Sequence, residues 1–174
     1  IATATASWRR SSGPRRSTWP NSRTSRLDSL PGFRRLRALA LTPLYLSADK
    51  GLSFQMPGAG QDSYVSDPAK PVPYLPRPIN FNDGRWSTYL VTDQRFVDGR
   101  PDVLSYTTPV LDKPVHIKGA PRVDLHAATT GRDSDFVVKL IDVYPEENSA
   151  DPTMAGYQLG VGIEIFRGRY VNGF

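Results

Sequence analysis

The run from Thr129 to Glu147, TTGRDSDFVVKLIDVYPEE, constrains the fold more than any other part of the sequence. It opens with small and acidic turn residues, continues through branched and aromatic side chains, and stops at Pro145. Apolar residues fall on both faces of the implied strand: Val137, Ile141 and Val143 on one, and Phe136, Val138 and Leu140 on the other. Lys139 and Asp142 interrupt the two faces. This pattern indicates the central strand of a two-sheet sandwich.

Further strand patterns follow one another downstream of about Thr42. The predicted strands are Leu44–Ser47, Leu52–Gln55, Ser63–Ser66, Val103–Thr108, Val115–Lys118, Val123–Thr129 and Tyr157–Phe166. The first two form a predicted hairpin in which Gly51 supplies the special turn backbone. In the last strand, the residues predicted to face inward are Leu159, Val161, Ile163 and Ile165. Such strands, without a convincing amphipathic helix, predict an all-β, antiparallel β-sandwich of jelly-roll type.

Two stretches between these strands have a different character. Residues 68–78 contain five prolines, so we expect them to run extended across a surface, anchored by Tyr74 and Ile79. Trp86–Thr92 is short and apolar-rich and lacks a convincing helical pattern. No closing strand follows Tyr170, so the sandwich is predicted to be incomplete.

Residues 1–40 differ sharply from the rest of the chain. They hold nine arginines, no lysine and one acid, a local net charge of +8, whereas residues 41–174 have a net charge of −3. Three interpretations are open: a basic tail that binds nucleic acid, an Arg- and Ser-rich transit peptide, or DNA translated out of frame. The abrupt change near Leu41 favours the last. We therefore predict a disordered or frame-shifted basic segment, residues 1–40, followed by a β-sandwich, residues 41–174.

The composition excludes several classes of site and partner. The chain has no cysteine, so disulfide scaffolds, zinc–thiolate sites and cysteine nucleophiles are excluded. No apolar run approaches the roughly 18–20 residues of a membrane span. Residues 1–40 also lack the regularly spaced aromatic residues of a nucleic-acid stacking platform. Neither a membrane nor nucleic acid is therefore an expected partner.

The sequence shows no catalytic apparatus of its own. A nucleophilic serine on an elbow needs a Gly-x-Ser-x-Gly motif, which is absent. A catalytic triad needs a histidine as base, and the only two are His116 and His126, both predicted on the outward faces of strands. Their spacing does not suit a metal site. No catalytic residue is assigned, and no metal or cofactor is expected.

The acidic residues in and around the strand predicted within Thr129–Glu147 leave three interpretations. They are Asp133, Asp135, Asp142, Glu146 and Glu147, with Ser134 among them. Their oxygens suit calcium, but no Asp-x-Asp-x-Asp-Gly loop with a terminal glutamate is present. A substrate-facing role is the second possibility. Asp and Ser before a strand more often bond to local backbone N–H groups and fix a turn, so a structural role is favoured.

Several long motifs resemble one family of enzymes. They are Thr42–Phe54, Tyr64–Pro78, Asp93–Leu111, Gly119–Glu147 and Gly156–Tyr170. In the same order, they are similar to the C-terminal jelly-roll domain of the α-amino-acid ester hydrolases. That domain also occurs in the cocaine-esterase-like and X-Pro dipeptidyl-peptidase serine hydrolases and in the glutaryl-cephalosporin acylases. The resemblance implies a galactose-binding-like β-sandwich that forms part of a larger enzyme.

The resemblance places the catalytic residues of such an enzyme upstream, in an α/β-hydrolase domain. It implies that this chain is non-catalytic and that its partner is that domain. It further implies that the whole enzyme is a homo-oligomer, often periplasmic or secreted, acting on small ester, amide or peptide substrates. Asp133, Ser134, Asp135, Phe136 and Asp142 match the family signature, where a structural role is expected. The alternative is a free-standing jelly-roll module that binds carbohydrate or protein, for which Trp86 is the single downstream tryptophan.

Overall fold

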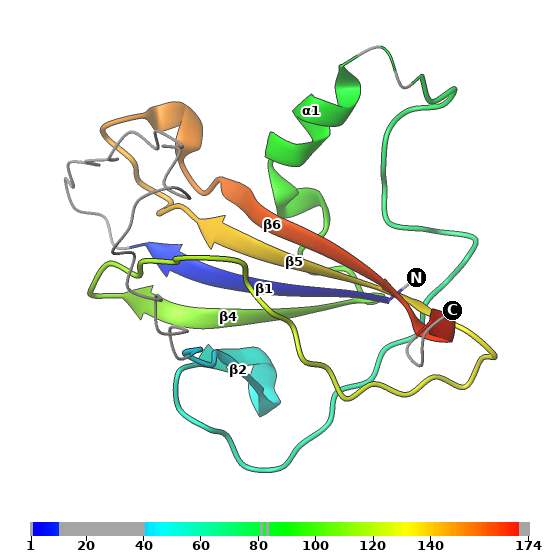
Figure 1. The fold of residues 1–174 in the computed structure, drawn as a ribbon. Helices are drawn as coiled ribbons and strands as arrows, with labels where there is room; N and C mark the ends of the chain where they lie inside the picture. The colour runs from blue at the N-terminus through cyan, green and yellow to red at the C-terminus, as the bar shows by residue number, and fades with distance from the viewer. Residues whose placement is uncertain (1, 11–40, 81, 83, 171–174) are drawn as a thin grey trace, which may run out of the picture.

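The described residues form one mixed β-sheet of six strands, in the order β2-β3-β4-β1-β5-β6 (Figure 1). The structure is a computed structural model that describes residues 2–10, 41–80, 82 and 84–170. The strands are β1 (Ala2–Arg10), β2 (Tyr45–Ser47), β3 (Gly51–Ser53), β4 (Val103–Leu111), β5 (Asp135–Val143) and β6 (Gln158–Arg167). The predicted all-β class is confirmed. The run around Lys139 is an interior strand, β5, as the sequence predicts.

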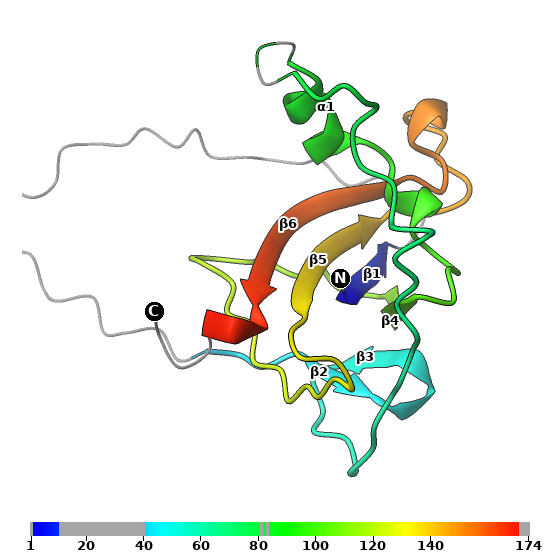
Figure 2. The same cartoon turned by 90° about the vertical axis from the view of Figure 1, so that its right-hand side faces the viewer.

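The directions of the strands differ from the antiparallel prediction. β1 runs parallel to both β4 and β5, and β3 meets β4 in parallel through the single pair Gly51 and Thr107. The pairs β2–β3 and β5–β6 are antiparallel. The sheet is strongly curved, as expected for a right-handed strand twist (Figure 2). The two long parallel pairs both involve β1, which lies between β4 and β5.

The strand at the N-terminus corrects one prediction. Residues 1–40 were expected to be disordered or frame-shifted; of these alternatives, disorder does not hold for Ala2–Arg10, which forms β1 and pairs on both sides. Its sequence begins ATATAS, and small residues with alternating threonine are compatible with an interior strand although they bury little apolar surface. Residues 11–40 lie outside the described residues. The basic segment and its three interpretations are therefore not addressed beyond Arg10.

One α-helix is present in the described part of the chain, where no helix was predicted. α1 spans Arg85–Val91 and overlaps the apolar-rich stretch Trp86–Thr92. Seven residues make fewer than two complete turns, too few to show a 3.6-residue period. Four short 3₁₀ helices accompany it: η1 (Ala48–Lys50), η2 (Gln94–Phe96), η3 (Pro152–Met154) and η4 (Gly168–Tyr170). Across the described residues, no helix has the length and apolar character needed to cross a membrane.

The predicted hairpin before residue 54 is confirmed, but its turn is built differently. β2 and β3 pair through Tyr45 with Ser53 and Ser47 with Gly51. The left-handed residues are Asp49, with φ of 63°, and Lys50, with φ of 59°, whereas Gly51 is extended with φ of −80°. The prediction that Gly51 supplies the special turn backbone was therefore wrong. An aspartate in the left-handed region is less costly than a branched residue because its short side chain bonds locally.

Three predicted strands are absent from the described sheet. Ser63–Ser66, Val115–Lys118 and Val123–Thr129 have no strand partner. Val123–Thr129 directly precedes β5 in sequence, but the position beside β5 is occupied by β1 on one side and β6 on the other. A strand pattern alone does not make a strand, because each strand also needs a free edge to pair with.

The proline-rich stretch behaves as expected and crosses the surface without joining the sheet. The Arg85 guanidinium on α1 donates to the carbonyl oxygens of Pro76 at 3.3 Å and Pro78 at 3.0 Å. The ring of Tyr74 packs edge-on against Tyr89, with 4.8 Å between centroids. These contacts attach the stretch to α1, and Tyr74 serves as one of the two predicted anchors.

The core is small and is contributed by β3, β4 and β5 together with Val97, which directly follows η2. Its buried apolar residues are Leu52, Val97, Val103, Tyr106, Ile141 and Val143. The predicted inward face of β6 is only partly covered: Leu159 and Ile163 are half-buried, but Val161 is 49% exposed and Ile165 is 61% exposed. The prediction that Val161 and Ile165 face inward was therefore wrong. β6 is the last strand of the described sheet, and nothing in the described chain covers them.

Candidate functional site

A lysine lies buried in the centre of the sheet beside α1. Lys139 on β5 is 2% exposed, and its ammonium donates to Gln94 Oε1 at 2.7 Å. The same nitrogen lies 5.7 Å from the centre of the Tyr89 ring and 5.4 Å from that of Phe96. Burial lowers the pKa of Lys139 to about 8, because the charged form loses its hydration. The two aromatic faces and one amide oxygen replace part of that hydration.

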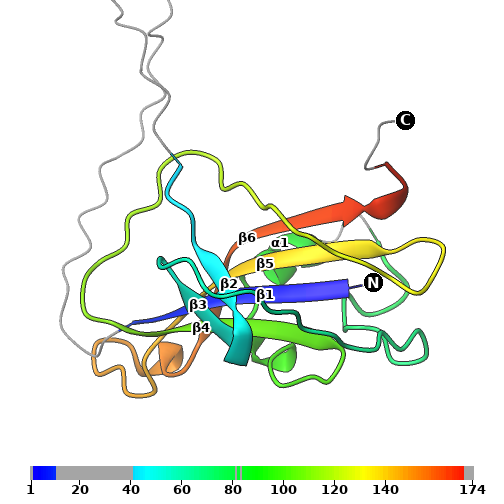
Figure 3. The same cartoon turned by 90° about the horizontal axis from the view of Figure 1, so that it is seen from below.

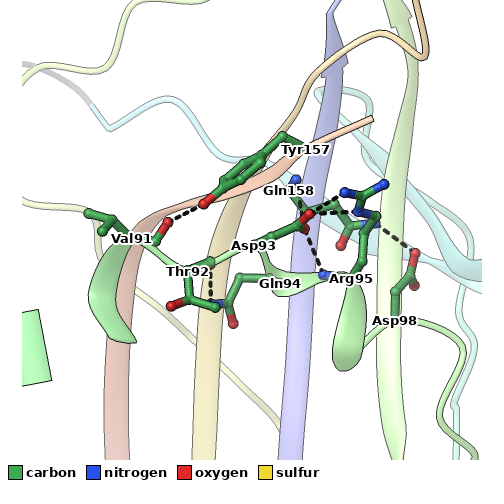
Figure 4. A network of polar contacts seen from close by, with 8 residues as sticks. All are labelled: Val91, Thr92, Asp93, Gln94, Arg95, Asp98, Tyr157 and Gln158. Atoms are coloured by element: carbon green, nitrogen blue, oxygen red, sulfur yellow. Dashed lines mark hydrogen bonds and ion pairs between the residues drawn. The ribbon is translucent and has the colours of Figure 1, made fainter. Parts of the chain in front are cut away.

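The segment that holds Gln94 is attached to the start of β6 by a polar network (Figure 4). Asp93 Oδ1 accepts hydrogen bonds from the backbone N–H of Arg95 at 3.0 Å and of Gln158 at 3.2 Å. Asp93 Oδ2 accepts from Arg95 Nε at 2.6 Å. Burial alone would raise the pKa of Asp93, but these hydrogen bonds outweigh it and hold the pKa below its usual range. Asp93 therefore fixes the start of η2 and joins it to β6.

The network continues on both sides of Asp93. The Tyr157 hydroxyl donates to the carbonyl oxygen of Val91 at 2.6 Å, which ties the end of α1 to the residue before β6. The amide of Gln158 donates to Asp98 Oδ2 at 2.9 Å. Gln94 Nε2 donates to the carbonyl oxygen of Thr92 at 2.7 Å, which orients its oxygen toward Lys139. Together these bonds position the covering of the buried lysine (Figure 4).

Two hollows border this region. One, of about 370 Å³, is lined by Arg95, Asp98, Gly99, Val143, Glu146, Gly156 and Gln158. The other, of about 370 Å³, is lined mainly by apolar atoms of the proline-rich stretch and α1, with Phe96 at its base: Pro73, Tyr74, Leu75, Pro76, Arg85, Thr88, Tyr89, Thr92 and Phe96. Neither hollow contains a serine, a cysteine or a histidine. Neither therefore contains a nucleophile with its base.

The two histidines do not form a catalytic set. His116 and His126 are both exposed and lie in the extended segment between β4 and β5. Neither makes a side-chain hydrogen bond to a serine or an acid within the described residues. No group of three or more metal-binding side chains is present there either. The described residues offer no arrangement for acyl transfer.

Three of the five predicted signature residues, Asp133, Ser134 and Asp135, lie together at one end of the β5–β6 pair. Asp135 accepts two hydrogen bonds from Arg167, at 2.9 Å and 3.0 Å, in a forked arrangement. Asp133 pairs with Arg169, and that arginine side chain lowers the pKa of Asp133. The carbonyl oxygen of Ser134 accepts from the backbone N–H of Gly168 at 2.9 Å.

The last two signature residues lie further along β5. Phe136 pairs with Phe166 across the β5–β6 ladder, and both rings are incompletely covered. Asp142 is 4% exposed and pairs with Leu159. Asp142 and the Asp133–Asp135 run are therefore on opposite ends of β5 and do not form one site. The carboxylates of Asp133 and Asp135 each form an ion pair with an arginine side chain.

The sequence did not single out Lys139 with Gln94, although one signal was present. Lys139 was noted only as an interruption in an otherwise apolar strand. A charged residue inside such a strand must find polar or aromatic partners when it is buried. Its partners come from η2 and α1, more than 40 residues earlier, and no local pattern indicates that approach.

The fold of the described residues defines an all-β domain. A model of the X-Pro dipeptidyl-peptidase C-terminal non-catalytic domain matches residues 15–168. The chain therefore belongs to this family. The prediction of the family from its motifs is confirmed.

Individual relatives agree with this assignment. Cocaine esterase from Rhodococcus sp. (strain MB1 Bresler) is 36% identical over 118 residues, which cover 62% of this chain and 20% of the esterase. An alpha-amino acid ester hydrolase labelled with selenomethionine is 60% identical with a TM-score of 0.69, covering 76% of this chain and 22% of that one. An aminopeptidase from the marine sediment archaeon Thaumarchaeota archaeon is 46% identical with a TM-score of 0.68, covering 75% and 22%. The chain thus spans about a fifth of the length of each relative.

Proposed function

We propose that this chain is the supporting β-domain of a serine hydrolase, packed against an α/β-hydrolase catalytic domain and forming one wall of its active-site cleft. The substrates of the whole enzyme are α-amino-acid esters, β-lactam side chains or X-Pro dipeptides. The chain alone is inactive. Its signature residues Asp133, Ser134, Asp135, Phe136 and Asp142 act structurally by fixing β5 and β6 relative to each other.

The observation that carries this proposal is the match to a non-catalytic domain family over residues 15–168. Two structural features support it. The described residues contain no nucleophile with its base. The named relatives are an esterase, an ester hydrolase and an aminopeptidase, all about five times longer than the matched region.

The surface that suits the catalytic domain is the apolar edge formed by β6. Val161 and Ile165 are exposed to 49% and 61%, and we refer to these two residues as the β6 patch. Ile165 pairs with Val137, so its side chain lies on the same face as Lys139, beyond the part covered by α1. An exposed apolar patch on the last strand of a sheet is typical of an interface. Its occupant in this proposal is the catalytic domain.

The decisive experiment compares the isolated chain with a chimera. The isolated chain should show no turnover of a phenylglycine methyl ester above buffer. In the chimera, the whole chain, residues 1–174, replaces the C-terminal domain of the alpha-amino acid ester hydrolase that is 60% identical. We expect the chimera to hydrolyse the ester with a kcat/KM within about tenfold of the parent.

Two variants of the chimera test the interface. Ile165→Asp places a charge on the β6 patch and should lower kcat/KM at least tenfold, because desolvating an unpaired carboxylate at an interface is costly. Val65→Asp is the matched control, since Val65 is 83% exposed and lies away from the sheet. Turnover by the isolated chain would refute the non-catalytic assignment. Equal activity of both variants would refute the β6 patch as the interface.

A further inference from the structure

The position between β4 and β5 is filled by a strand from far away in the sequence. β1 runs parallel to both neighbours, so β4 and β5 run in the same direction. Residues 112–134 connect the end of β4 to the start of β5 and must therefore return along the whole length of the sheet. Figures 1 and 3 show this connection passing outside the sheet as an extended trace. Parallel neighbours need such a crossover, whereas antiparallel neighbours are joined by short turns.

The returning connection has the sequence of a strand but lacks strand pairing. Val123 and Leu125 are half-buried and alternate with exposed Asp124 and His126. Within the described residues, no backbone–backbone hydrogen bond involves residues 113–133. A chain that returns from the end of β4 to the start of β5 runs antiparallel to both. It therefore has the direction of an ideal partner for the edges that β1 occupies.

The family match does not include the present occupant. The matched region begins at residue 15, and β1 ends at Arg10. The matched region contains β4, β5 and all of residues 112–134. The part of this chain that matches the family thus contains the returning connection and does not reach β1. This observation does not depend on any pairing in the structure.

We propose that the position between β4 and β5 accepts either of two strands of this chain: β1, inserted in parallel, or Val123–Thr129, inserted antiparallel. The two arrangements exclude each other because both use the same edges of β4 and β5. Insertion of Val123–Thr129 converts the crossover into a β-meander with two turns. Residues 1–10 are then released from the sheet, so the N-terminal segment is a removable occupant that competes with the domain's own strand.

The register of the second arrangement follows from the turn before β5. A five-residue turn at residues 130–134 pairs Thr129 with Asp135, a length within the range of hairpin loops. Counting back along the two strands, Leu125 then lies opposite Lys139, and Val123 lies opposite Ile141. Ile141 is fully buried and Lys139 is 2% exposed. This register therefore directs the apolar residues of the inserted strand to the buried face of the sheet, and Asp124 and His126 to the other.

Hydrogen exchange of the full chain tests the exchange of strands. Ala4→Pro weakens β1, because Ala4 pairs with both Leu104 and Val138 and proline cannot donate to the ladder. We expect the amides of Val123–Thr129 to exchange at least tenfold more slowly in this variant than in the unchanged chain. Ala59→Pro, in an exposed loop outside the sheet, is the control and should leave their exchange unchanged.

Engineered disulfides report the register, because the chain has no cysteine of its own. Ser7→Cys with Ile141→Cys reports β1, since these two residues are paired in the structure. Val123→Cys with Ile141→Cys reports the second arrangement. In the β1 arrangement Ile141 is paired with Ser7, and Val123 lies in the connection that has no strand partner, so the two cysteines are not held side by side as a disulfide requires. Ala4→Pro should raise the rate of the Val123–Ile141 cross-link at least tenfold and abolish the Ser7–Ile141 one.

If the cysteine variants fail to fold, the hydrogen-exchange result alone tests the proposal, since Ala4→Pro leaves Ile141 intact. Faster or unchanged exchange at Val123–Thr129 in the Ala4→Pro chain, whether or not the rest of the sheet survives, overturns the proposal. A cross-link from position 124 rather than 123 to position 141 overturns the register. Neither outcome bears on whether the domain packs against a hydrolase, which the chimera tests separately.

Discussion

At the scale of single residues, Lys139 is a buried charge in the sheet whose burial opposes folding. Its ammonium has an amide oxygen and two aromatic faces as neighbours. No carboxylate among the described residues offsets the free-energy cost of burying this charge. Its pKa of about 8 lies below the usual value of 10.5. The folded state therefore releases this proton more readily than the unfolded state does. At neutral pH the charged form opposes folding by about 3 kcal/mol, from the size of that difference.

Replacing Lys139 by methionine should stabilise the chain at neutral pH. The unchanged chain should gain about 1 kcal/mol in the free energy of unfolding between pH 7 and pH 9, because the unfolded state holds more protons in that interval. Lys139→Met should be more stable at pH 7 and should lose this rise, since methionine carries no charge and fills a similar volume. Urea unfolding at the two pH values measures both effects.

Lys113→Met is the matched control, because Lys113 is exposed in the segment after β4. It should leave both the stability at pH 7 and its rise toward pH 9 unchanged. A stability that is flat from pH 7 to pH 9 in the unchanged chain would contradict the lowered pKa of Lys139.

Tyr106 on β4 gives a second prediction at this scale. It is 5% exposed, and its hydroxyl donates to Asp62 Oδ2 at 2.8 Å. Lys50 pairs with the other oxygen of Asp62. Hydrogen bonds from Lys50 and Tyr106 lower the pKa of Asp62 below its usual 3.8. Tyr106→Phe should therefore lower the free energy of unfolding by about 1 kcal/mol at pH 7.

The pH dependence of that loss has a definite sign. A carboxylate whose pKa is lowered by folding stabilises the chain above its unfolded-state pKa, and this contribution is lost as the pH falls through the folded value. The difference between the unchanged chain and Tyr106→Phe should thus shrink between pH 5 and pH 2. Tyr45→Phe, at a half-buried position on β2, should show no such convergence. Parallel acid unfolding curves for the chain and Tyr106→Phe would contradict the hydrogen bond to Asp62.

At the scale of elements, the sequence was informative wherever a strand carries its own pattern. β4, β5 and β6 were found because their runs are long and apolar or alternating, and the β2–β3 hairpin because two strands flank a short turn. The parallel strand β1 was missed because ATATASWRR follows no apolar pattern. Its place is decided by the free edges of β4 and β5, which are properties of the assembled sheet. The same competition explains why Val123–Thr129 was predicted as a strand and is not one.

The candidate site shows the same division between local and long-range information. Asp133 and Asp135 were singled out because acidic residues before a strand are a local signal. Their arginine partners are Arg167, the last residue of β6, and Arg169, just after it, and they become neighbours only through the β5–β6 ladder. The cover of Lys139 by Gln94 depends likewise on how η2 is attached to β6 through Asp93. Such contacts need the register of the sheet to be known first.

The connection between β5 and β6 yields a prediction at the element scale. Gly156 is buried, has φ of +63°, and donates its N–H to the carbonyl oxygen of Pro145 at 2.9 Å. An added Cβ would lie 2.7 Å from Glu146 Oε2, so that side chain must also move. Gly156→Ala should therefore lower the free energy of unfolding by about 1–2 kcal/mol, the cost of the left-handed region for alanine. Chemical denaturation measures it.

The variant Gly99→Ala separates the cost of a left-handed backbone from the cost of crowding by the added Cβ atom. Gly99 has a similar φ of +71°, but an added Cβ would have no atom within 4 Å. Its alanine variant should lose only the backbone part, so Gly156→Ala should be at least as destabilising as Gly99→Ala. The opposite order would mean that the turn between β5 and β6 relaxes to accept the side chain.

At the scale of the whole molecule, the sheet is covered unevenly. α1 and η2 lie against β5 and β6, where Lys139 and Ile141 are buried, and the curvature of the sheet is seen in Figure 2. The β6 patch is left exposed, with Val161 at 49% and Ile165 at 61%. The catalytic domain that we propose as a partner would cover it.

The isolated chain should consequently self-associate through the β6 patch. An edge strand with apolar side chains pairs readily with another copy of itself when its usual cover is absent. Sedimentation velocity over a range of protein concentrations should show the average mass rising with concentration. Ile165→Asp should keep the chain monomeric to concentrations at least tenfold higher, because a charge on the edge opposes both pairing and desolvation. Val65→Asp adds the same charge on an exposed site away from β6 and should associate like the unchanged chain; equal behaviour of the two variants would place the association elsewhere on the surface.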